Sequence, residues 1–225
     1  MKICCISDTH NRHEKLSIPE CDILICSGDI TGRGELENVL DFARWFNVQP
    51  AKHLILVPGN HEKGWERDIE KYNEEILKVC PRVNILIDRT IIINGIKIHG
   101  SPVTPFFFNW AWNRAVDPNP VLCRSKVMVV PEIKPHWDMV PDDVNILVTH
   151  GPPYGILDLL IDGHTRVGCN HLMNRINELK ELKLHVFGHI HYSSGEQYFN
   201  GIKFVNASVC DEEYYPINPV RIVEI

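Results

Sequence analysis

The sequence lacks any apolar run of the roughly 20 residues that a membrane-spanning helix requires. It begins with Met1-Lys2-Ile3 and enters a strand-like run directly, without the charged region, apolar region and cleavage site of a signal peptide. Its eight cysteines form no C-x-x-C pair, which argues against a zinc–thiolate site or a disulfide framework. We therefore expect reduced, buried thiols, a cytoplasmic location and no membrane contact.

Positive charge is also scarce. The chain has 23 Lys and Arg against 29 Asp and Glu, which gives a net charge of -6, and it has no Lys/Arg clusters. Long nucleic acids and anionic membranes are therefore poor partners, and a phosphate-bearing substrate would need a metal ion to attract it. The 225 residues, 44% apolar and 23% charged, predict a single domain over residues 1–225 and leave the oligomeric state open.

Histidine is abundant, at twelve residues. Apolar runs of strand length are followed at once by Asp, Asn or His, and ligands bind beyond the carboxyl ends of strands in an open α/β sheet, so these side chains are expected to converge on one site. We expect Asp29, after the run Ile23–Cys26, near its centre. The other runs precede Asp8 and His10, Asn60 and His61, His150, and His189 and His191.

Helix and strand patterns alternate along the first part of the chain, which is typical of parallel βαβ units. Asn-Gly pairs then mark two hairpins, so the sheet structure is mixed. The predicted helices cover about 34–47, 65–80 and 172–182; the hairpins join 90–94 to 96–100 and 197–199 to 202–205; a terminal strand covers 220–225. Residues 101–143 are proline-rich and aperiodic, which predicts a long loop or insertion.

Two pairs of donors have the same spacing, Asp8-x-His10 and His189-x-His191. In an extended backbone, residues i and i+2 point to the same side, so each pair is expected to hold one ion. Carboxylate, amide and imidazole ligands without thiolate suit Mn²⁺, Fe or Zn²⁺ better than Cu(I) or Ca²⁺.

The ordered motifs resemble those of the calcineurin-like metallophosphoesterases, over residues 8 to 191. The motifs are Asp8-x-His10, Gly28-Asp29, Gly59-Asn60-His61-Glu62, His150 and Gly188-His189-x-His191. The sequence around these motifs, including Thr149–Pro153 and Val186–His191, resembles the class III phosphodiesterase-like branch, called metallophosphoesterase-domain-containing proteins. Asp, Asn and Gly are also common in turns, but an explanation by turns alone needs five coincidences.

The resemblance implies an α/β fold, a four-layer αββα sandwich of two mixed β-sheets flanked by helices. It also implies two divalent metal ions at one edge, Mn²⁺ before Fe or Zn²⁺. The implied ligands are Asp8, His10 and His191 for the first ion, Asn60, His150 and His189 for the second, and Asp29 bridging both.

The implied reaction is attack by a metal-bridging hydroxide on a small phosphodiester or phosphomonoester, such as a nucleotide. We assign His61, Asp29 and Asn60 to catalysis, with His61 as general acid, and Arg33, Asn60 and His164 to substrate binding. Related serine/threonine phosphatases place an Asp three residues after the bridging Asp, where it pairs with the catalytic His. Here Gly32 occupies that position, so another group must orient His61.

Two other functions are compatible with these motifs: a nuclease of the same superfamily, and a catalytically weak metal-binding scaffold. The acidic charge argues against the nuclease, and the presence of suitable residues at all seven ligand positions, together with His61, argues against the scaffold. Trp110 and Trp112 could stack on a nucleobase, but aromatic clusters usually belong to the core, which we favour here. His164 could also be a solvated loop residue.

Overall fold

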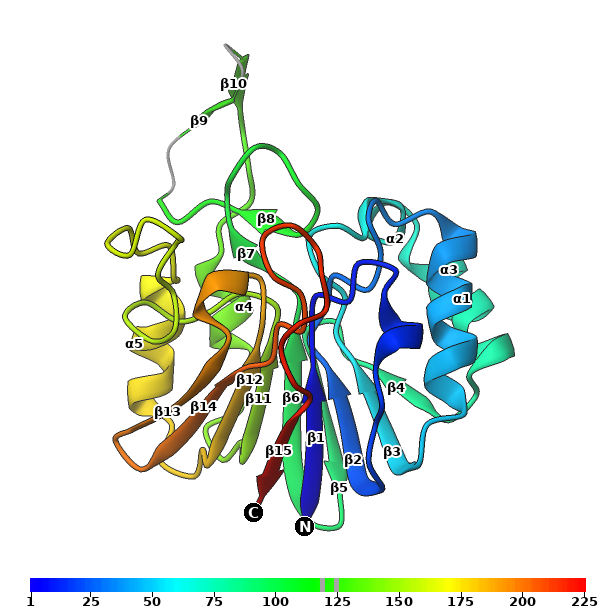
Figure 1. The fold of residues 1–225 in the computed structure, drawn as a ribbon. Coiled ribbons are helices and arrows are strands. Elements are labelled where there is room, and N and C mark those ends of the chain that lie inside the picture. Colours follow the sequence, from blue (N-terminus) through cyan, green and yellow to red (C-terminus); the bar gives the residue numbers. More distant parts are fainter. Residues whose placement is uncertain (118–119, 124–125) are drawn as a thin grey trace.

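The computed structural model describes residues 1–117, 120–123 and 126–225. Two mixed β-sheets lie face to face, and helices cover the outer face of each sheet (Figure 1). The predicted αββα sandwich is confirmed.

The first sheet has the strand order β15-β1-β2-β3-β4. Its strands are β1 (Lys2–Ile6), β2 (Cys21–Cys26), β3 (Ala51–Leu56), β4 (Val83–Ile85) and β15 (Arg221–Glu224). Strands β1 to β4 run parallel, and β15 pairs antiparallel with β1. The carboxyl ends of β1, β2 and β3 therefore meet at one edge of the sheet.

The second sheet has the order β13-β14-β12-β11-β6-β5. Its strands are β5 (Arg89–Ile93), β6 (Ile96–Ser101), β11 (Ile146–Thr149), β12 (Leu184–Phe187), β13 (Gly195–Phe199) and β14 (Ile202–Asn206). The four central strands are parallel, and both predicted hairpins form the antiparallel edges. Asn94 and Asn200 adopt φ angles of 51° and 48°, as tight hairpin turns require.

The strands of the first sheet are apolar on both faces because each face packs on another layer. Ile3 and Cys5 pack between the two sheets, whereas Cys4 and Ile6 pack against the helices. This double burial explains the continuous apolar runs in the sequence. Each fully buried aliphatic side chain stabilises the fold by about 1.5–3 kcal/mol.

The helices over the first sheet are α1 (Leu36–Asn47), α2 (Lys63–Arg67) and α3 (Ile69–Val79). The prediction of α1 is confirmed, but the single helix predicted over 65–80 is wrong. Asp68 interrupts it with φ −145° and ψ 69°, and its side chain accepts a hydrogen bond from the Lys71 backbone N–H at 3.2 Å. Asp68 therefore caps α3, because a short acceptor side chain satisfies an N–H that has no partner within the helix.

The second sheet is covered by α4 (Lys134–Asp138) and α5 (Asn170–Glu178). Helix α5 ends before the predicted boundary because Leu179 is extended, with ψ 103°. Leu179 and Leu182 nevertheless remain in the core.

The segment predicted as one long loop contains short elements, although residues 118, 119, 124 and 125 lie outside the described chain. These elements are β7 (Thr104–Pro105), β8 (Asn113–Arg114), β9 (Val121–Cys123), β10 (Lys126–Met128) and α4; short 3₁₀ turns occur at His13–Lys15 and His191–Ser193. The Asp88 carboxylate accepts hydrogen bonds from Ser101 Oγ at 2.6 Å and His136 Nδ1 at 2.8 Å. The segment is thereby fastened to the second sheet at both ends.

Within the described ranges, no helix is long and apolar enough to cross a membrane. The cysteines with described side chains are unpaired and buried. The prediction of buried thiols is therefore confirmed for these cysteines.

Replacing Asp68 should destabilise the protein without disturbing the strand-end residues. Loss of the cap in Asp68→Ala is expected to lower the free energy of unfolding by about 1 kcal/mol. Chemical denaturation measures this change. The matched variant Glu74→Ala, an exposed change on the same helix, should stay within about 0.5 kcal/mol of the wild type. Equal free energies of unfolding in the two variants would show that the Asp68 side chain does not stabilise α3.

Candidate metal centre

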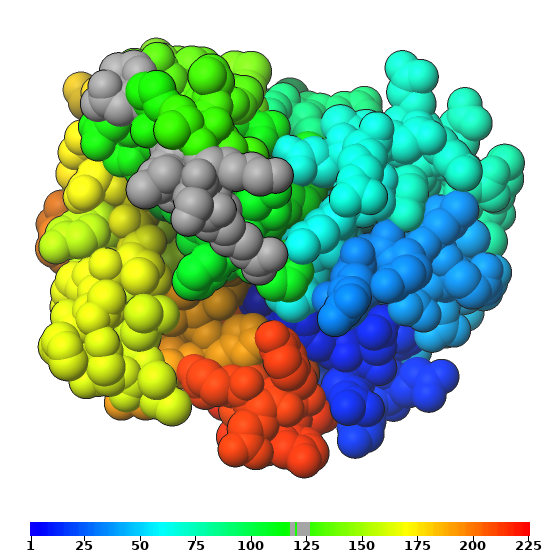
Figure 2. Space-filling model, turned by 90° about the horizontal axis from the view of Figure 1, so that it is seen from above, coloured from blue at the N-terminus to red at the C-terminus, as the bar shows by residue number. Residues whose placement is uncertain are grey.

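The polar residues that follow the parallel strands lie together at one end of the two sheets. Figure 2 shows this end from above, hollowed between the red C-terminal loop, the yellow segment after β11 and the green segment after β7. The predicted donors that meet there are Asp8, His10, Asp29, Asn60, His61, His150, His189 and His191.

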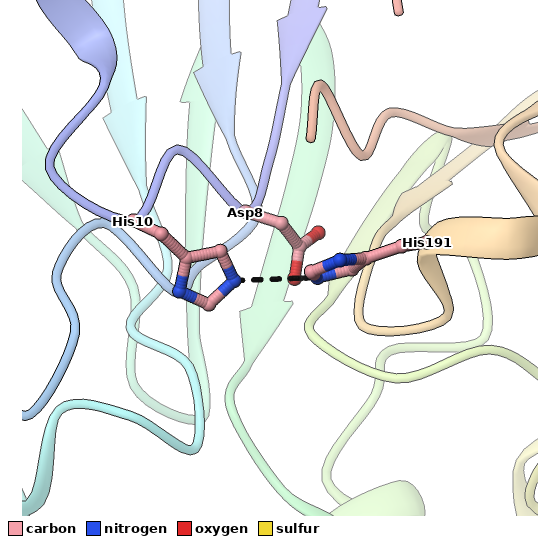
Figure 3. Close-up of side chains that lie close together, drawn as sticks. All are labelled: Asp8, His10 and His191. Atoms are coloured by element: carbon pink, nitrogen blue, oxygen red, sulfur yellow. Dashed lines mark hydrogen bonds and ion pairs between the residues drawn. The ribbon is translucent and has the colours of Figure 1, made fainter. Parts of the chain in front are cut away.

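Two groups of donor atoms form this centre. Those of Asp8, His10 and His191 lie within 4.8 Å of one another (Figure 3). A second group contains Asp29, His150 and His189 within the same distance, and Asp29 also groups with His10 and His61. The carboxylate of Asp29 therefore lies between the two groups.

Asn60 belongs beside the second group. Its Oδ1 lies 2.8 Å from His150 Nε2. His189 and His191 thus lie in different donor groups, as the ligand partition implied by the resemblance has them, whereas their spacing alone led us to expect one ion for the pair.

The extended backbone assumed for these pairs is wrong. Asp8, His10, Asp29 and His189 have φ angles of 55°, 42°, 50° and 71°, which lie in the left-handed region. Such residues are strained, and they cluster at functional sites where the surrounding structure holds them. Here the chain turns sharply at the end of each strand, which aims the side chains into the common space.

Two glycines permit the close approach of these turns. A Cβ on Gly59 would lie 2.3 Å from Asp29 Oδ1, and one on Gly188 would lie 2.1 Å from Asp8 Oδ2. Any larger residue would displace a donor, which explains why glycine precedes Asn60 and His189.

Backbone carbonyl groups orient the imidazoles. Nδ1 of His10, His150 and His191 donates to Thr31 O at 3.3 Å, Ser27 O at 2.9 Å and Asp211 O at 2.7 Å, respectively. A carbonyl oxygen can only accept, so Nδ1 carries a proton in each ring, and Nε2 is the nitrogen that faces the centre and could bind a metal ion.

The first group of donors fits a cation because the Nε2 atoms of two imidazoles face the same point. Nε2 of His10 and Nε2 of His191 are 3.2 Å apart. Burial lowers the pKa of His191, but Asp8, whose Oδ1 lies 3.4 Å from this nitrogen, raises it to about 9, so Nε2 of His191 carries a proton that a bound cation would replace. The hard oxygen and imidazole donors fit a divalent ion such as Mn²⁺, Fe²⁺ or Zn²⁺.

The carboxylates supply negative charge. Burial raises the pKa of Asp29, but His150 and His61 lower it more, so this pKa lies well below its usual range. Burial likewise opposes ionisation of Asp8, yet its hydrogen bond with His191 brings the pKa below the ordinary value. Burial lowers the pKa of His150, but Asp29 raises it to about 9. Ionised carboxylates thus attract positive charge to this centre.

Sequence reasoning gave no role to Glu62, which is fully buried. Its carboxylate accepts from the N–H groups of Asp29 at 3.0 Å, Gly59 at 2.7 Å and Thr31 at 3.1 Å, and from Thr31 Oγ1 at 3.0 Å. Burial and the Asp29 carboxylate raise the pKa of Glu62 to about 8. The hydrogen bonds from Gly59 and Thr31 oppose this rise and favour the ionised form, in which Glu62 accepts from all four donors and ties the turns after β2 and β3 together.

Ser208 and Asp211 were also missed. Ser208 Oγ donates to Asp8 Oδ2 at 2.7 Å, and the Asp211 carbonyl orients His191. Both follow β14, another parallel strand of the second sheet. The rule that polar residues after a parallel strand face the site could have identified them.

The group that orients His61 is the Gly32 backbone. Nδ1 of His61 donates to Gly32 O at 2.6 Å, and Nε2 lies 3.8 Å from Asp29 Oδ2. The His61 ring stacks on Trp110, with ring centroids 4.5 Å apart and an angle of 19° between the planes. A backbone carbonyl thus replaces the Asp of related phosphatases. The core prediction holds for Trp112, which is 2% exposed, but Trp110 lines the site.

A central cavity of about 360 Å³ lies over the centre, with Asp29, Asn60, His61, His189 and His191 in its walls. An adjoining cavity of about 350 Å³ has Arg33 beside His10 and His61.

The structure does not bring His164 into either wall. Its side chain is 82% exposed, and its Nδ1 and backbone N–H bond to Asp162 in the same loop.

Comparison with known proteins identifies the family. The family model described as calcineurin-like phosphoesterase matches residues 1–193. Metallophosphoesterase domain-containing protein 1 of Homo sapiens is 32% identical over 241 residues, covering 98% of this chain and 70% of that protein. UPF0046 protein K07C11.7 of Caenorhabditis elegans is 30% identical over 223 residues, covering 94% and 71%.

Solved structures share the fold at low identity. Phosphopantetheinyl hydrolase (PptH) from Mycobacterium tuberculosis has a TM-score of 0.60 at 17% identity, covering 99% of this chain and 95% of that one. TT1561 of Thermus thermophilus has a TM-score of 0.58 at 15% identity, covering 91% and 88%. From the family match over most of the chain, we conclude that this protein belongs to the calcineurin-like phosphoesterases and is a metal-dependent phosphoric ester hydrolase.

Proposed function

We propose that this enzyme uses two divalent metal ions, with Mn²⁺ the first candidate, to hydrolyse small phosphodiesters or phosphomonoesters such as nucleotides. The observation that carries the proposal is the pair of donor groups on either side of Asp29. Asp8, His10 and His191 would hold the first ion, Asn60, His150 and His189 the second, and Asp29 both.

Bound there, the ions would neutralise charge on the phosphoryl oxygens and supply a nucleophilic water at neutral pH. The chain's own residues determine the geometry. Asp29 accepts a hydrogen bond from the His61 backbone N–H at 2.8 Å, so the bridging carboxylate also places His61. Asn60 is fixed beside His150 and can also face a substrate oxygen, because it lines the central cavity.

His61 is proposed as the general acid. Because Nδ1 donates to Gly32 O, the proton available for transfer must be on Nε2, the nitrogen nearer Asp29. Stacking on Trp110 restricts rotation of the ring. His61 is thus held in the orientation needed to protonate a departing alkoxide at the cavity.

Arg33 is proposed to contact a phosphate oxygen from the adjoining cavity. The small central cavity fits a small ester better than a long polyanion, in line with the net charge of -6. The buried, unpaired cysteines fit a reducing compartment, and we propose a cytoplasmic location on that ground.

Asp29→Asn should impair both metal sites. An amide is neutral and a weak ligand for a hard cation, so the variant is expected to lose tightly held metal from the whole centre. Metal analysis after gel filtration gives the ions per chain. Asp41→Asn, an exposed change on α1, serves as the control and should keep wild-type metal content. Two tightly held ions in Asp29→Asn would contradict the bridging assignment.

Glu62→Gln should loosen the turns that carry Asp29 and Asn60. The new NH₂ group would face N–H donors, and unsatisfied buried groups cost about 1–3 kcal/mol each. A fall of that size in the free energy of unfolding, together with weaker metal binding, is expected from denaturation and metal titration. Glu66→Gln, which alters a half-buried surface pair with Arg114, should retain wild-type metal affinity. Unchanged stability and affinity in Glu62→Gln would assign Glu62 no such role.

His61→Ala tests the general acid through the leaving group. Its removal should cost roughly 10²- to 10⁴-fold in kcat with an alkyl or ribosyl leaving group, which departs badly as an anion. A 4-nitrophenolate group needs little protonation, so 4-nitrophenyl esters should be spared relative to nucleotide esters. Steady-state kinetics at full metal content measure both. An equal loss on the two substrate types would mean that His61 positions the phosphate or supports Asn60.

A further inference from the structure

A third cavity lies beside the metal centre, and the proposed chemistry does not use it. Its volume is about 620 Å³, and we call it the aromatic cavity. It shares Phe107, Leu160, His189 and Ile190 with the central cavity, so the two cavities adjoin. Its remaining walls are Pro105, Phe106, Phe108, Tyr154, Arg166, Val167, Gly168 and Asn170.

One wall is built around the fully buried side chain of Asp158. Its carboxylate accepts from the N–H groups of Gly155 at 2.9 Å and Gly168 at 3.2 Å, and it pairs with Arg166 Nη1. A backbone hydrogen bond from Val167 N to Asp158 O at 3.1 Å closes the same turn. The wall is therefore formed before any ligand enters, which lowers the entropy lost on binding.

The lining indicates the chemistry of the occupant. Aromatic and aliphatic side chains make most of the walls, while Arg166 and Asn170 supply polar groups. Arg166 uses one nitrogen for Asp158 and remains 39% exposed, which leaves further N–H donors for a ligand. A planar aromatic group with hydrogen-bond acceptors, such as a nucleobase, fits this combination, and the volume falls in the usual range of about 300–1,000 Å³ for small-molecule sites.

The position of His61 decides which part of the substrate lies there. His61 lines the central cavity but is absent from the aromatic cavity, whereas His189 of the second donor group lines both. The ester oxygen that departs must lie beside the general acid. The group in the aromatic cavity is therefore one that stays on phosphorus.

We propose that the aromatic cavity binds the retained ester group of a phosphodiester, and that this group is an aryl or nucleoside unit. This inference rests on the proposed function. A phosphomonoester would leave the cavity empty, so occupancy favours diesters with a bulky, planar retained group.

The test compares two diesters that share a 4-nitrophenolate leaving group and differ only in the retained group. These are thymidine 5′-(4-nitrophenyl phosphate) and methyl 4-nitrophenyl phosphate. The wild-type enzyme is expected to show a kcat/KM about tenfold or more higher for the thymidine ester, as stacking of a base on aromatic side chains typically provides. Calorimetric binding of phenylphosphonate against methylphosphonate, neither of which can be hydrolysed, gives a second readout.

Val167→Trp fills the cavity without altering a proposed metal ligand. It should abolish both preferences while kcat/KM for the methyl ester stays within about twofold of the wild type. Phe106→Ala removes a wall instead and should weaken the preferences. Phe199→Ala, a change on the outer strand β13 where the side chain is 42% exposed, is the matched control and should retain them. Thermal unfolding confirms that each variant is folded.

Two results would overturn the subsite. One is equal kcat/KM for the two diesters in the wild type; the other is an unchanged preference in both Val167→Trp and Phe106→Ala. In either case, metal-dependent hydrolysis of the methyl ester would still support the proposed function. If no ester were hydrolysed with any metal, the proposed function would fail. Calorimetry would then decide on the cavity alone: tighter binding of phenylphosphonate than of methylphosphonate, lost in Val167→Trp, would show that it binds an aromatic group.

Discussion

The buried carboxylate of Glu62 makes the hydrogen bonds on which the turns carrying Asp29 and Asn60 depend. It accepts from the backbone of the turn after β2, at Asp29 and Thr31, and from the turn after β3, at Gly59. Without it, several buried N–H groups would lack partners, each at a cost of about 1–3 kcal/mol. Because Asp29 in turn accepts a hydrogen bond from the His61 backbone N–H, the proposed bridging carboxylate and the proposed general acid are positioned by one acceptor.

Hydrogen bonds of His150 and His189 join the two sheets at the centre. His150 follows β11 in the second sheet, yet its ring donates to Ser27 O after β2 in the first. The His189 N–H likewise donates to Asp8 Oδ2 at 2.9 Å. Proposed ligands from both sheets thus meet where the two sheets face each other. Any ion that binds there binds only the assembled sandwich, so it should stabilise the packing of one sheet on the other.

Much of this was readable from the sequence because strand ends have a local signature. An apolar run buried on both faces, then glycine and a polar donor, predicted the strands and the residues that converge. The break at Asp68 was missed because Trp65, which precedes it, stands at helical spacing from Ile69 and Ile76. The roles of Glu62 and of the Gly32 carbonyl depend on backbone groups from another strand, which no local pattern encodes. The tendency of aromatic clusters to be buried likewise could not separate Trp112, which is buried, from Trp110, which lines the site.

Under the proposed mechanism, the segment after β7 would link substrate preference to the position of the general acid. Loops usually vary more than the strand ends that carry catalytic groups, and here one segment supplies Phe106 and Phe107 to the aromatic cavity and Trp110 to the face of His61. The Ala111 N–H donates to Asn60 O at 3.1 Å, so the segment is bonded to the turn that bears a proposed ligand. A change that reshapes the aromatic cavity by moving this backbone would therefore also shift the ring that restrains the general acid. Side-chain changes on the opposite wall, beside Arg166, would be free of this coupling, so the proposed substrate preference could vary there without moving Trp110 or Asn60.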